Sequence, residues 1–301
     1  MDVIGRLLAL LVLLLVGLAL RQVGVFDDRR TARLNAAAYY VALPALIFVS
    51  TYDQSIGKLV STALVTGLLI VVFATAALAW LVHRDAGSDA RRSVAVVQSY
   101  HSNLGYLGLP LVAATFDAEV TAVASVILGV LSLVQVPLTV FVLVRINAVA
   151  TSISREVTQL VTNPVLLALA AGLAVGSAGP TVPSSAVTAL DVLAAFALPL
   201  ALLCVGASLD LDLPSIDGVA TGSVVALKIG CMPVLAWLVF SSLAVDSATF
   251  TASVVMLGTP TAVSTYVFAS ELGGDEAFAS LNVFATTLGS VGTLFVLITV
   301  V

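Results

Sequence analysis

Ser99–Leu111, with the sequence SYHSNLGYLGLPL, places a histidine, an asparagine, two glycines and a proline in an otherwise apolar region. Proline removes a backbone donor and clashes with the preceding turn, and glycine weakens a helix, so a membrane-spanning helix is predicted to break here. Inside hydrocarbon, freed backbone groups are tolerated only where they line a cavity or are buried in protein. Met256–Tyr266, MLGTPTAVSTY, has the same character. One broken helix in each half of a membrane protein indicates a transporter binding site.

Composition places the chain in the membrane. Of 301 residues, 60% are hydrophobic and only 10% are charged, whereas soluble domains are about 25% charged. A span needs roughly 20 residues, so there is room for about ten spans and for no separate catalytic or nucleic-acid-binding domain. The net charge of -5 also argues against nucleic acid as a partner. The expected fold class is an all-α polytopic membrane protein.

Hydropathy and the positions of glycine and proline predict ten transmembrane helices, of which the fourth and ninth are broken. Their predicted ranges are 2–20, 33–51, 57–82, 92–113, 119–144, 158–176, 186–208, 218–241, 248–270 and 277–300. The apolar stretch Val3–Leu20 is interpreted as a retained first helix and not as a signal peptide. It is long enough to span, and no clear small-residue cleavage site follows it.

Short motifs recur in the same order in both halves of the chain. They are Gly17–Ala19 with Gly172–Ala174 (155 residues apart), Ala42–Pro44 with Ala197–Pro199 (155), Pro110 with Pro260 (150), and Phe141–Leu143 with Phe295–Leu297 (154). Because a unit of five spans is odd, the second copy enters the membrane from the opposite side, which predicts an inverted repeat. We therefore expect a first five-helix repeat over 1–144, a cytoplasmic linker over 145–157 and a second repeat over 158–301.

Basic residues in short loops predict the orientation, since cytoplasmic loops are enriched in arginine and lysine. Arg6 and Lys58 belong to one predicted face of the membrane. The other face holds Arg21, Arg29, Arg30, Arg33, Arg84, Arg91, Arg92, Arg145 and Arg155. This bias predicts a protein of the plasma (cytoplasmic) membrane with both termini outside and the 145–157 linker in the cytoplasm.

Polar residues at the first break are candidates for ligand contact. Asn103 carries an amide that can offer two donors and an acceptor to a substrate; the alternative is a helix–helix hydrogen bond within the bundle. His101 can titrate near neutral pH and is a candidate for proton handling, although a histidine near the cytoplasmic end can also simply face water. Gly105, Gly108 and Pro110 are predicted to make the break itself.

The second half contributes a charge and several hydroxyls. Lys228 is the one basic residue well inside a predicted span, where a charge is costly and by default functional. It could attract an anionic substrate, or it could snorkel or bind carbonyls exposed at a broken helix. Gly258 and Pro260 are predicted to make the second break. The hydroxyls of Thr259, Thr261 and Ser264 either satisfy freed backbone groups or meet substrate.

The sequence gives little support for an enzymatic function. No His-Glu-x-x-His motif of an intramembrane metalloprotease is present. Tyr52-Asp53 resembles half of an intramembrane aspartyl protease signature, but Leu272–Asp275 lacks the first glycine that the other half needs. Phosphate-loop and dinucleotide motifs are missing from the sequence. We expect no catalytic residues, no metal and no cofactor; whether a coupling ion is used, and whether it is H⁺ or Na⁺, stays open.

Four motifs in order resemble the auxin efflux carrier family, and the similarity extends over nearly the whole chain. The motifs are Tyr40–Phe48 (YVALPALIF), Asn103–Pro110 (NLGYLGLP), Leu198–Leu209 (LPLALLCVGASL) and Pro260–Ala269 (PTAVSTYVFA). The family includes plant PIN-type auxin exporters and bacterial carriers proposed for malate or malonate. The long cytoplasmic loop of many plant members is reduced here to about 12 residues, so control by kinases through that loop is not carried over.

The resemblance implies ten spans in two inverted five-helix repeats whose broken helices 4 and 9 cross at mid-membrane. It implies a scaffold of helices 1, 2, 6 and 7, usually dimeric, and a mobile transport domain of helices 3–5 and 8–10 that moves like an elevator. The family asparagine corresponds to Asn103, and the crossover prolines correspond to Pro110 and Pro260.

Together these observations predict a secondary carrier for a small organic anion, such as a mono- or dicarboxylate or an auxin-like acid. The positive ends of half-helices would favour a carboxylate, with Asn103, Thr259, Thr261, Ser264 and Lys228 around it. We expect a homodimer in the lipid bilayer. A sodium-coupled symporter of the bile-acid type is the alternative within transport; a channel or a membrane sensor is the alternative outside it.

Overall fold

The structure is a computed structural model that describes residues 3–85, 87–149, 160–208 and 218–301, with side chains described from Leu11 onward. Within these ranges the chain is helical and forms no strand, apart from one isolated antiparallel bridge between Ser102 and Thr261. The prediction of an all-α polytopic membrane protein is confirmed by the helices of this described part.

Six described helices are long and apolar enough to cross a membrane. They are Asp28–Thr51, Thr62–Val82, Ala118–Asn147, Ser184–Ala207, Gly218–Ser242 and Glu276–Val300. Shorter apolar helices cover Leu11–Gln22, Leu104–Thr115, Pro164–Ala178 and Ser247–Leu257. A described helix lies in each of the ten predicted ranges. The predicted 145–157 linker falls outside the described residues from residue 150 onward, and its first residues still belong to the helix that ends at Asn147.

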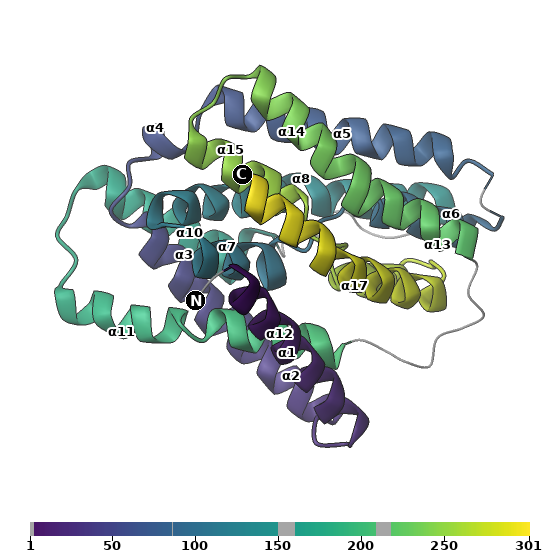
Figure 1. Cartoon of the computed structure of the whole chain (residues 1–301), viewed down its shortest axis with the longest axis horizontal. Helices are drawn as coiled ribbons and strands as arrows, with labels where there is room; N and C mark the ends of the chain where they lie inside the picture. Colours follow the sequence, from purple (N-terminus) through teal and green to yellow (C-terminus); the bar gives the residue numbers. More distant parts are fainter. Residues whose placement is uncertain (1–2, 86, 150–159, 209–217) are drawn as a thin grey trace. The chain divides into compact units, whose positions relative to one another are not determined.

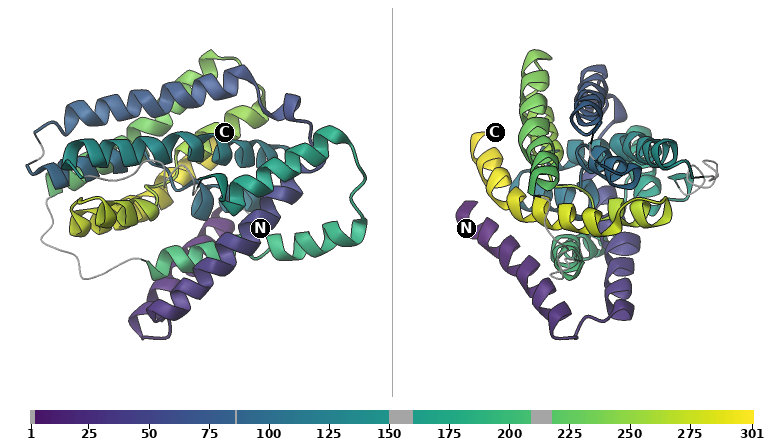
Figure 2. Two further views of the ribbon diagram at one scale, coloured as in Figure 1. Left: turned by 180° about the vertical axis from the view of Figure 1, so that it is seen from behind. Right: turned by 90° about the vertical axis from the view of Figure 1, so that its right-hand side faces the viewer.

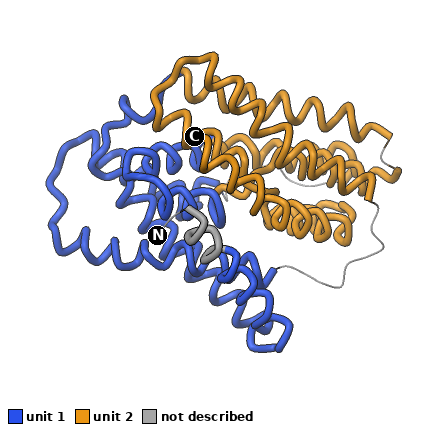
Figure 3. The backbone as a smooth tube through the Cα atoms, in the orientation of Figure 1, with its two compact units in different colours: residues 1–62, 105–130, 158–208 blue, residues 63–104, 131–157, 209–301 orange. Residues whose placement is uncertain are grey.

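The chain forms two compact units, which Figure 3 colours separately. Unit 1 comprises residues 1–62, 105–130 and 158–208, and unit 2 comprises residues 63–104, 131–157 and 209–301. The helix α8 (Ala118–Asn147) contributes residues to both.

Unit 1 is built from helices of both halves of the chain. Its helices are α1 (Val3–Gln22), α2 (Asp28–Ala37), η1 (Ala38–Ala42), α3 (Leu43–Thr51), α4 (Ile56–Leu59), α7 (Leu109–Thr115), α10 (Pro164–Ala178), α11 (Ser184–Ala194) and α12 (Ala197–Ala207), with nearly all of η2 (Leu104–Gly108). The elements α2, η1 and α3 follow one another as one continuous helix (Figure 2). The main contacts are α1 on α12 and α3 on α10. Asp27 caps the N-terminus of α2 by accepting a hydrogen bond from Arg30 N.

Glycines bring the backbones of α1 and α12 together. A Cβ added at Gly206 would meet the backbone of Leu14 and lie 3.0 Å from Leu18 N, and a Cβ at Gly17 would lie 3.0 Å from Leu203 Cα. Main-chain atoms on a packed helix cannot move aside as a flexible side chain can. Small residues of this kind let membrane helices pack closely.

Replacing Gly206 with alanine is therefore expected to destabilise the protein by about 1–3 kcal/mol, the usual cost of overpacking. Gly57→Ala is the matched control in the same unit, because no heavy atom lies within 4 Å of a Cβ added there. Thermal unfolding in detergent should give a lower midpoint for Gly206→Ala alone. Equal midpoints for the two variants would show that this helix contact is looser than described.

Unit 2 contains both sides of the second break and the first half of the first. Its helices are α5 (Thr62–Val82), α6 (Asp89–Gln98), α13 (Gly218–Val225), η3 (Ala226–Cys231), α14 (Met232–Ser242), α15 (Ser247–Leu257), α16 (Ser264–Glu271) and α17 (Glu276–Val300), together with the second part of α8. Here α14 packs on α15, and α17 contacts α6, α13, α15 and α16. Figure 1 labels α5, α6, α8, α13, α14, α15 and α17.

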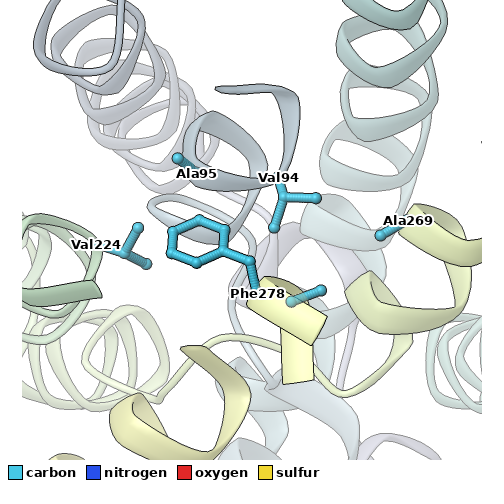
Figure 4. Packing of buried hydrophobic residues seen from close by; sticks show 6 residues of the cluster. Val94, Ala95, Val224, Ala269 and Phe278 are labelled. Carbon is cyan, nitrogen blue, oxygen red and sulfur yellow. The ribbon is translucent and has the colours of Figure 1, made fainter. Parts of the chain in front are cut away.

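A small apolar core joins α6, α13, α16 and α17. Phe278, only 3% exposed, packs with Val94, Ala95, Val224 and Ala269 (Figure 4). The five residues come from four helices, of which α6 is more than 100 residues away from the others in the sequence. This cluster ties the N-terminal helix of one broken span to the C-terminal helix of the other.

In the described residues, three π-helical turns interrupt the α-helices, and each ends two residues before a proline. η1 ends before Pro44, η2 before Pro110 and η3 before Pro233. Proline has no N–H, and its ring crowds the carbonyl four residues earlier, so the preceding turn widens. The turn η3 carries Lys228.

Candidate functional site

Two helices are interrupted within the stretches that the sequence singles out. After α6 ends at Gln98, the non-helical residues are Ser99–Asn103, and the helix resumes at Leu104. After α15 the non-helical residues are Gly258–Val263, which contain Pro260, and α16 then begins. Proline at 260 cannot donate to the ladder and restricts the residue before it, so α15 cannot continue through this point.

The two non-helical segments, called here the crossover, cross as a short antiparallel pair. Asn103 N donates to Pro260 O at 2.8 Å, and Ala262 N donates to His101 O at 3.0 Å. The Thr261 hydroxyl donates to the same His101 carbonyl at 3.2 Å. Broken helices leave backbone groups that must find partners in a membrane interior. At the crossover, each broken helix supplies hydrogen-bond partners for backbone groups of the other.

The Gln135 side chain of α8 holds the first segment from the side. Its Oε1 accepts from Ser102 N at 3.3 Å, and its Nε2 donates to Tyr100 O at 3.1 Å. Gln135 is 1% exposed, so both bonds form away from water. Thr286 of α17 plays a similar part for the second segment, because its hydroxyl oxygen accepts from Thr261 N at 3.3 Å.

Lys228 is fully buried and binds the end of a broken helix. Its Nζ donates to Leu257 O at 3.0 Å and lies 3.3 Å from Met232 Sδ. Leu257 is the last residue of α15, where carbonyls lack intrahelical partners and the helix dipole is negative. The same sulfur also receives the Ser102 hydroxyl at 3.8 Å. Met232 thus links the ammonium to the crossover.

The charge of Lys228 has no carboxylate beside it in the part of the chain that the structure describes. The ion pairs there join arginines to exposed aspartates at other places. A buried ammonium without a counter-ion is costly even when it binds a carbonyl. An anionic ligand beside Lys228 would lower this cost.

The side chain of Asn103, at the crossover, carries a donor that makes no hydrogen bond to a described residue. The residue is 2% exposed, and its Nδ2 has no hydrogen-bond partner among the described residues. Leaving a buried donor unpaired costs about 1–3 kcal/mol, so such groups point to a function or a ligand. The backbone N–H of Asn103 is already used by Pro260 O. The side chain is therefore free to meet another acceptor.

His101 is buried at the same segment, with 5% of its surface exposed, and so does not face water. Its Nδ1 lies 2.8 Å from Thr139 Oγ1, which is also 3.3 Å from Tyr100 Oη. The imidazole, a hydroxyl and a phenol thus form one short chain on the α8 side of the crossover. Its role in proton handling stays a prediction.

The other predicted residues lie at different places around the two breaks. Thr259 Oγ1 donates to Met256 O at 2.8 Å, and Thr261 Oγ1 is used as described above, so both hydroxyls satisfy freed carbonyls. Ser264 is exposed at the first residue of α16. Gly258 is the C-cap of α15. Gly105 and Gly108 belong to η2, and Pro110 lies in the first turn of α7, where proline is tolerated.

Sequence reasoning missed a buried amide network next to the crossover. Gln98 Nε2 donates to Thr265 Oγ1 and to Ala279 O, both at 3.0 Å, and Asn282 Nδ2 donates to Gln98 Oε1 at 2.9 Å. Gln98, Gln135 and Asn282 are amides inside predicted spans, and polar residues in spans usually face the bundle interior. That signal was available, but it does not say which helix each amide meets.

His83, which follows the last residue of α5, predicts a pH dependence of stability. It is 2% exposed, its Nε2 lies 3.2 Å from Ser99 Oγ, and burial lowers the pKa of His83 from 6.5 to about 4. The unfolded chain therefore binds more protons between these values. The contribution of His83 to the free energy of unfolding is fully present above pH 6.5. It falls as the pH drops toward 4, by up to about 3 kcal/mol.

A His83→Gln variant should lose this contribution, because glutamine can still reach Ser99 but does not titrate. We expect the unfolding midpoints of the two proteins to diverge below pH 6.5, with the natural protein falling faster. Parallel curves down to pH 4 would mean that His83 is not desolvated in the folded protein.

Comparison with known proteins gives two matches. The family model described as a membrane transport protein matches residues 2–156 and 150–298. An uncharacterized transporter of Methanothermobacter thermautotrophicus is 30% identical over 114 residues, which make up 37% of this chain. The chain thus spans 38% of the length of that curated relative.

The family match fits the geometry described above, with apolar helices long enough to span and two broken helices that cross in one unit. A match to a family of membrane transport proteins fits an integral membrane protein with several apolar helices. Because the family model matches nearly its whole length, the chain belongs to the family of membrane transport proteins, and its resemblance to the auxin efflux carriers is confirmed.

Proposed function

We propose that the protein is a secondary carrier that moves a small organic anion, such as a mono- or dicarboxylate or an auxin-like acid, across the plasma membrane. The observation that carries the proposal is the buried ammonium of Lys228, which no described carboxylate neutralises and which Met232 links to the crossover. An anion that binds there would meet a positive potential in a medium of low dielectric.

Asn103 would orient the anion. Its Nδ2 is a buried donor without a partner among the described residues, and a carboxylate oxygen is a strong acceptor for it. The N-terminus of α16, which begins at Ser264, presents the positive end of a helix dipole. The hydroxyls of Thr259 and Thr261 would act indirectly, since they hold the carbonyls on which the crossover depends.

Transport would follow the scheme that the family resemblance implies. In this proposal, ten spans form two inverted five-helix repeats, over 1–144 and 158–301, joined by the 145–157 linker. Helices 1, 2, 6 and 7 form the scaffold of a homodimer, with both termini outside, and helices 3–5 and 8–10 carry the substrate by an elevator-like movement. Gly105, Gly108, Pro110, Gly258 and Pro260 keep the two crossing helices broken.

A thermal-shift screen of the purified protein tests the substrate class. Small mono- and dicarboxylates are added with and without sodium at two pH values, and matched neutral amides serve as controls. We expect one or more carboxylates to raise the unfolding midpoint while their amides do not. A sodium requirement would favour the bile-acid type of symporter. Stabilisation by amines or amides, and not by acids, would contradict an anion site.

A further inference from the structure

A groove of about 610 Å³ lies in unit 2, with η3 and α14 on one side and α17 on the other. Its volume is in the range of about 300–1,000 Å³ that ligand sites have. Its lining is apolar, with Thr293 the single hydroxyl residue among the described residues that line it. The groove has no part in the crossover and is formed within unit 2 alone.

Glycines make the groove deep. Gly230 on η3 and Gly289 and Gly292 on α17 line it, and all three are exposed. No heavy atom lies within 4 Å of a Cβ added at Gly230 or Gly292. The rim is formed by large apolar side chains, of which Val234 is 58% exposed and Val296 is 54% exposed. The lining extends along residues 229–238 on one side and 289–297 on the other, so an elongated apolar object fits between them.

The depth of the groove in the membrane decides what that object is. Gly230 lies near the middle of the spanning helix Gly218–Ser242, and Gly289 lies near the middle of Glu276–Val300. The hydrocarbon core of a bilayer is about 30 Å thick, so the middle of a span is surrounded by acyl chains. A polar ligand would lose its hydrogen bonds at this depth.

We propose that the groove binds one acyl chain of a membrane lipid, which packs against the exposed side of the turn that carries Lys228. Ile229 and Gly230 follow Lys228 directly in η3, and both line the groove. A bound chain covers this side of the widened turn, while the opposite side presents the ammonium to Leu257 O. The lipid would thus support the conformation that holds the charge at the crossover.

Trp237 provides a direct probe, because its indole lines the groove and packs edge-on against Phe250 at 4.9 Å between ring centroids. The chain has two tryptophans, and Trp80→Phe removes the other while it keeps a ring for Arg92. This variant is reconstituted in phosphatidylcholine vesicles whose acyl chains carry bromine at mid-chain. Bromine quenches tryptophan fluorescence only at short range.

We expect strong quenching of Trp237, and its loss when Gly292→Leu is added, because the leucine side chain would occupy the groove and no heavy atom lies within 4 Å of its Cβ. Gly222→Leu is the matched control: it is an exposed glycine of α13 with no heavy atom within 4 Å of an added Cβ, and it lies outside the groove. Quenching should persist in that control. Unfolding midpoints of both leucine variants should match that of the parent.

Two outcomes would overturn the proposal. Equal quenching in Gly292→Leu and Gly222→Leu would show that the chain near Trp237 lies outside the groove. Absence of quenching in the parent would show that a second copy of the protein, or another segment, covers it. The inference rests on the membrane setting and not on the anion, so a failure to find carboxylate transport would leave the quenching result intact.

Discussion

Replacement of Lys228 with methionine is expected to weaken carboxylate binding by about 30- to 150-fold. A unit charge acting over about 5–8 Å at an effective dielectric constant near 20 contributes about 2–3 kcal/mol to an anion's binding. Methionine has a similar length and removes the ammonium, with its charge and its N–H donors. Isothermal titration or thermal shift with the best carboxylate measures the change.

The fold should survive this substitution. Leu257 O loses its donor, which costs about 1–3 kcal/mol, but the buried ammonium disappears at the same time, and its desolvation no longer opposes folding. Lys58→Met is the control, because Lys58 is the other lysine of the chain and is exposed on α4. Unchanged carboxylate affinity in a folded Lys228→Met protein would mean that Lys228 only caps the C-terminus of α15 and does not act on the substrate.

Replacement of Asn103 with alanine is expected to weaken binding by about 10- to 150-fold, since a hydrogen bond to a charged group contributes about 1.5–3 kcal/mol. Because its Nδ2 has no partner among the described residues, its removal should barely change the unfolding midpoint. Asn103→Asp should bind still more weakly, because a carboxylate there would repel the anion. Affinity and unfolding midpoint are measured on the same preparations.

Asn282→Ala separates a ligand contact from a structural amide. Asn282 is fully buried, and its Nδ2 donates to Gln98 Oε1, so its loss leaves that oxygen unpaired. We expect the free energy of unfolding of this variant to be lower by about 1–3 kcal/mol. If instead Asn103→Ala unfolds early and still binds carboxylate, Asn103 holds the crossover together and does not contact substrate.

Local chemistry made the helices and their interruptions predictable. Long apolar runs predicted spans, and a described helix lies in each predicted range. Gly258 and Pro260 predicted a break in the ninth span, and α15 ends at Leu257, just before them. The exact place of the first break was harder. Pro110 fits in the first turn of α7, where its missing N–H does no harm, and the non-helical residues are Ser99–Asn103 instead.

Long-range partners could not be predicted from one sequence. Lys228 was recognised as a costly buried charge, but Leu257 O is 29 residues away in the sequence, and nothing local joins the two. Gln135 brackets the first break from 33 residues away, and Asn282 meets Gln98 across 184. Such pairs depend on how helices pack, which hydropathy does not encode.

Counterflow in liposomes tests the central claim most directly. Purified protein is reconstituted in vesicles loaded with an unlabelled carboxylate that binds in the thermal-shift screen, and a trace of the labelled acid is added outside. We predict uptake that saturates with concentration, is stimulated by the internal acid, and is lost in Lys228→Met. Binding without uptake, or uptake that is linear in concentration and indifferent to the internal acid, would contradict an anion carrier.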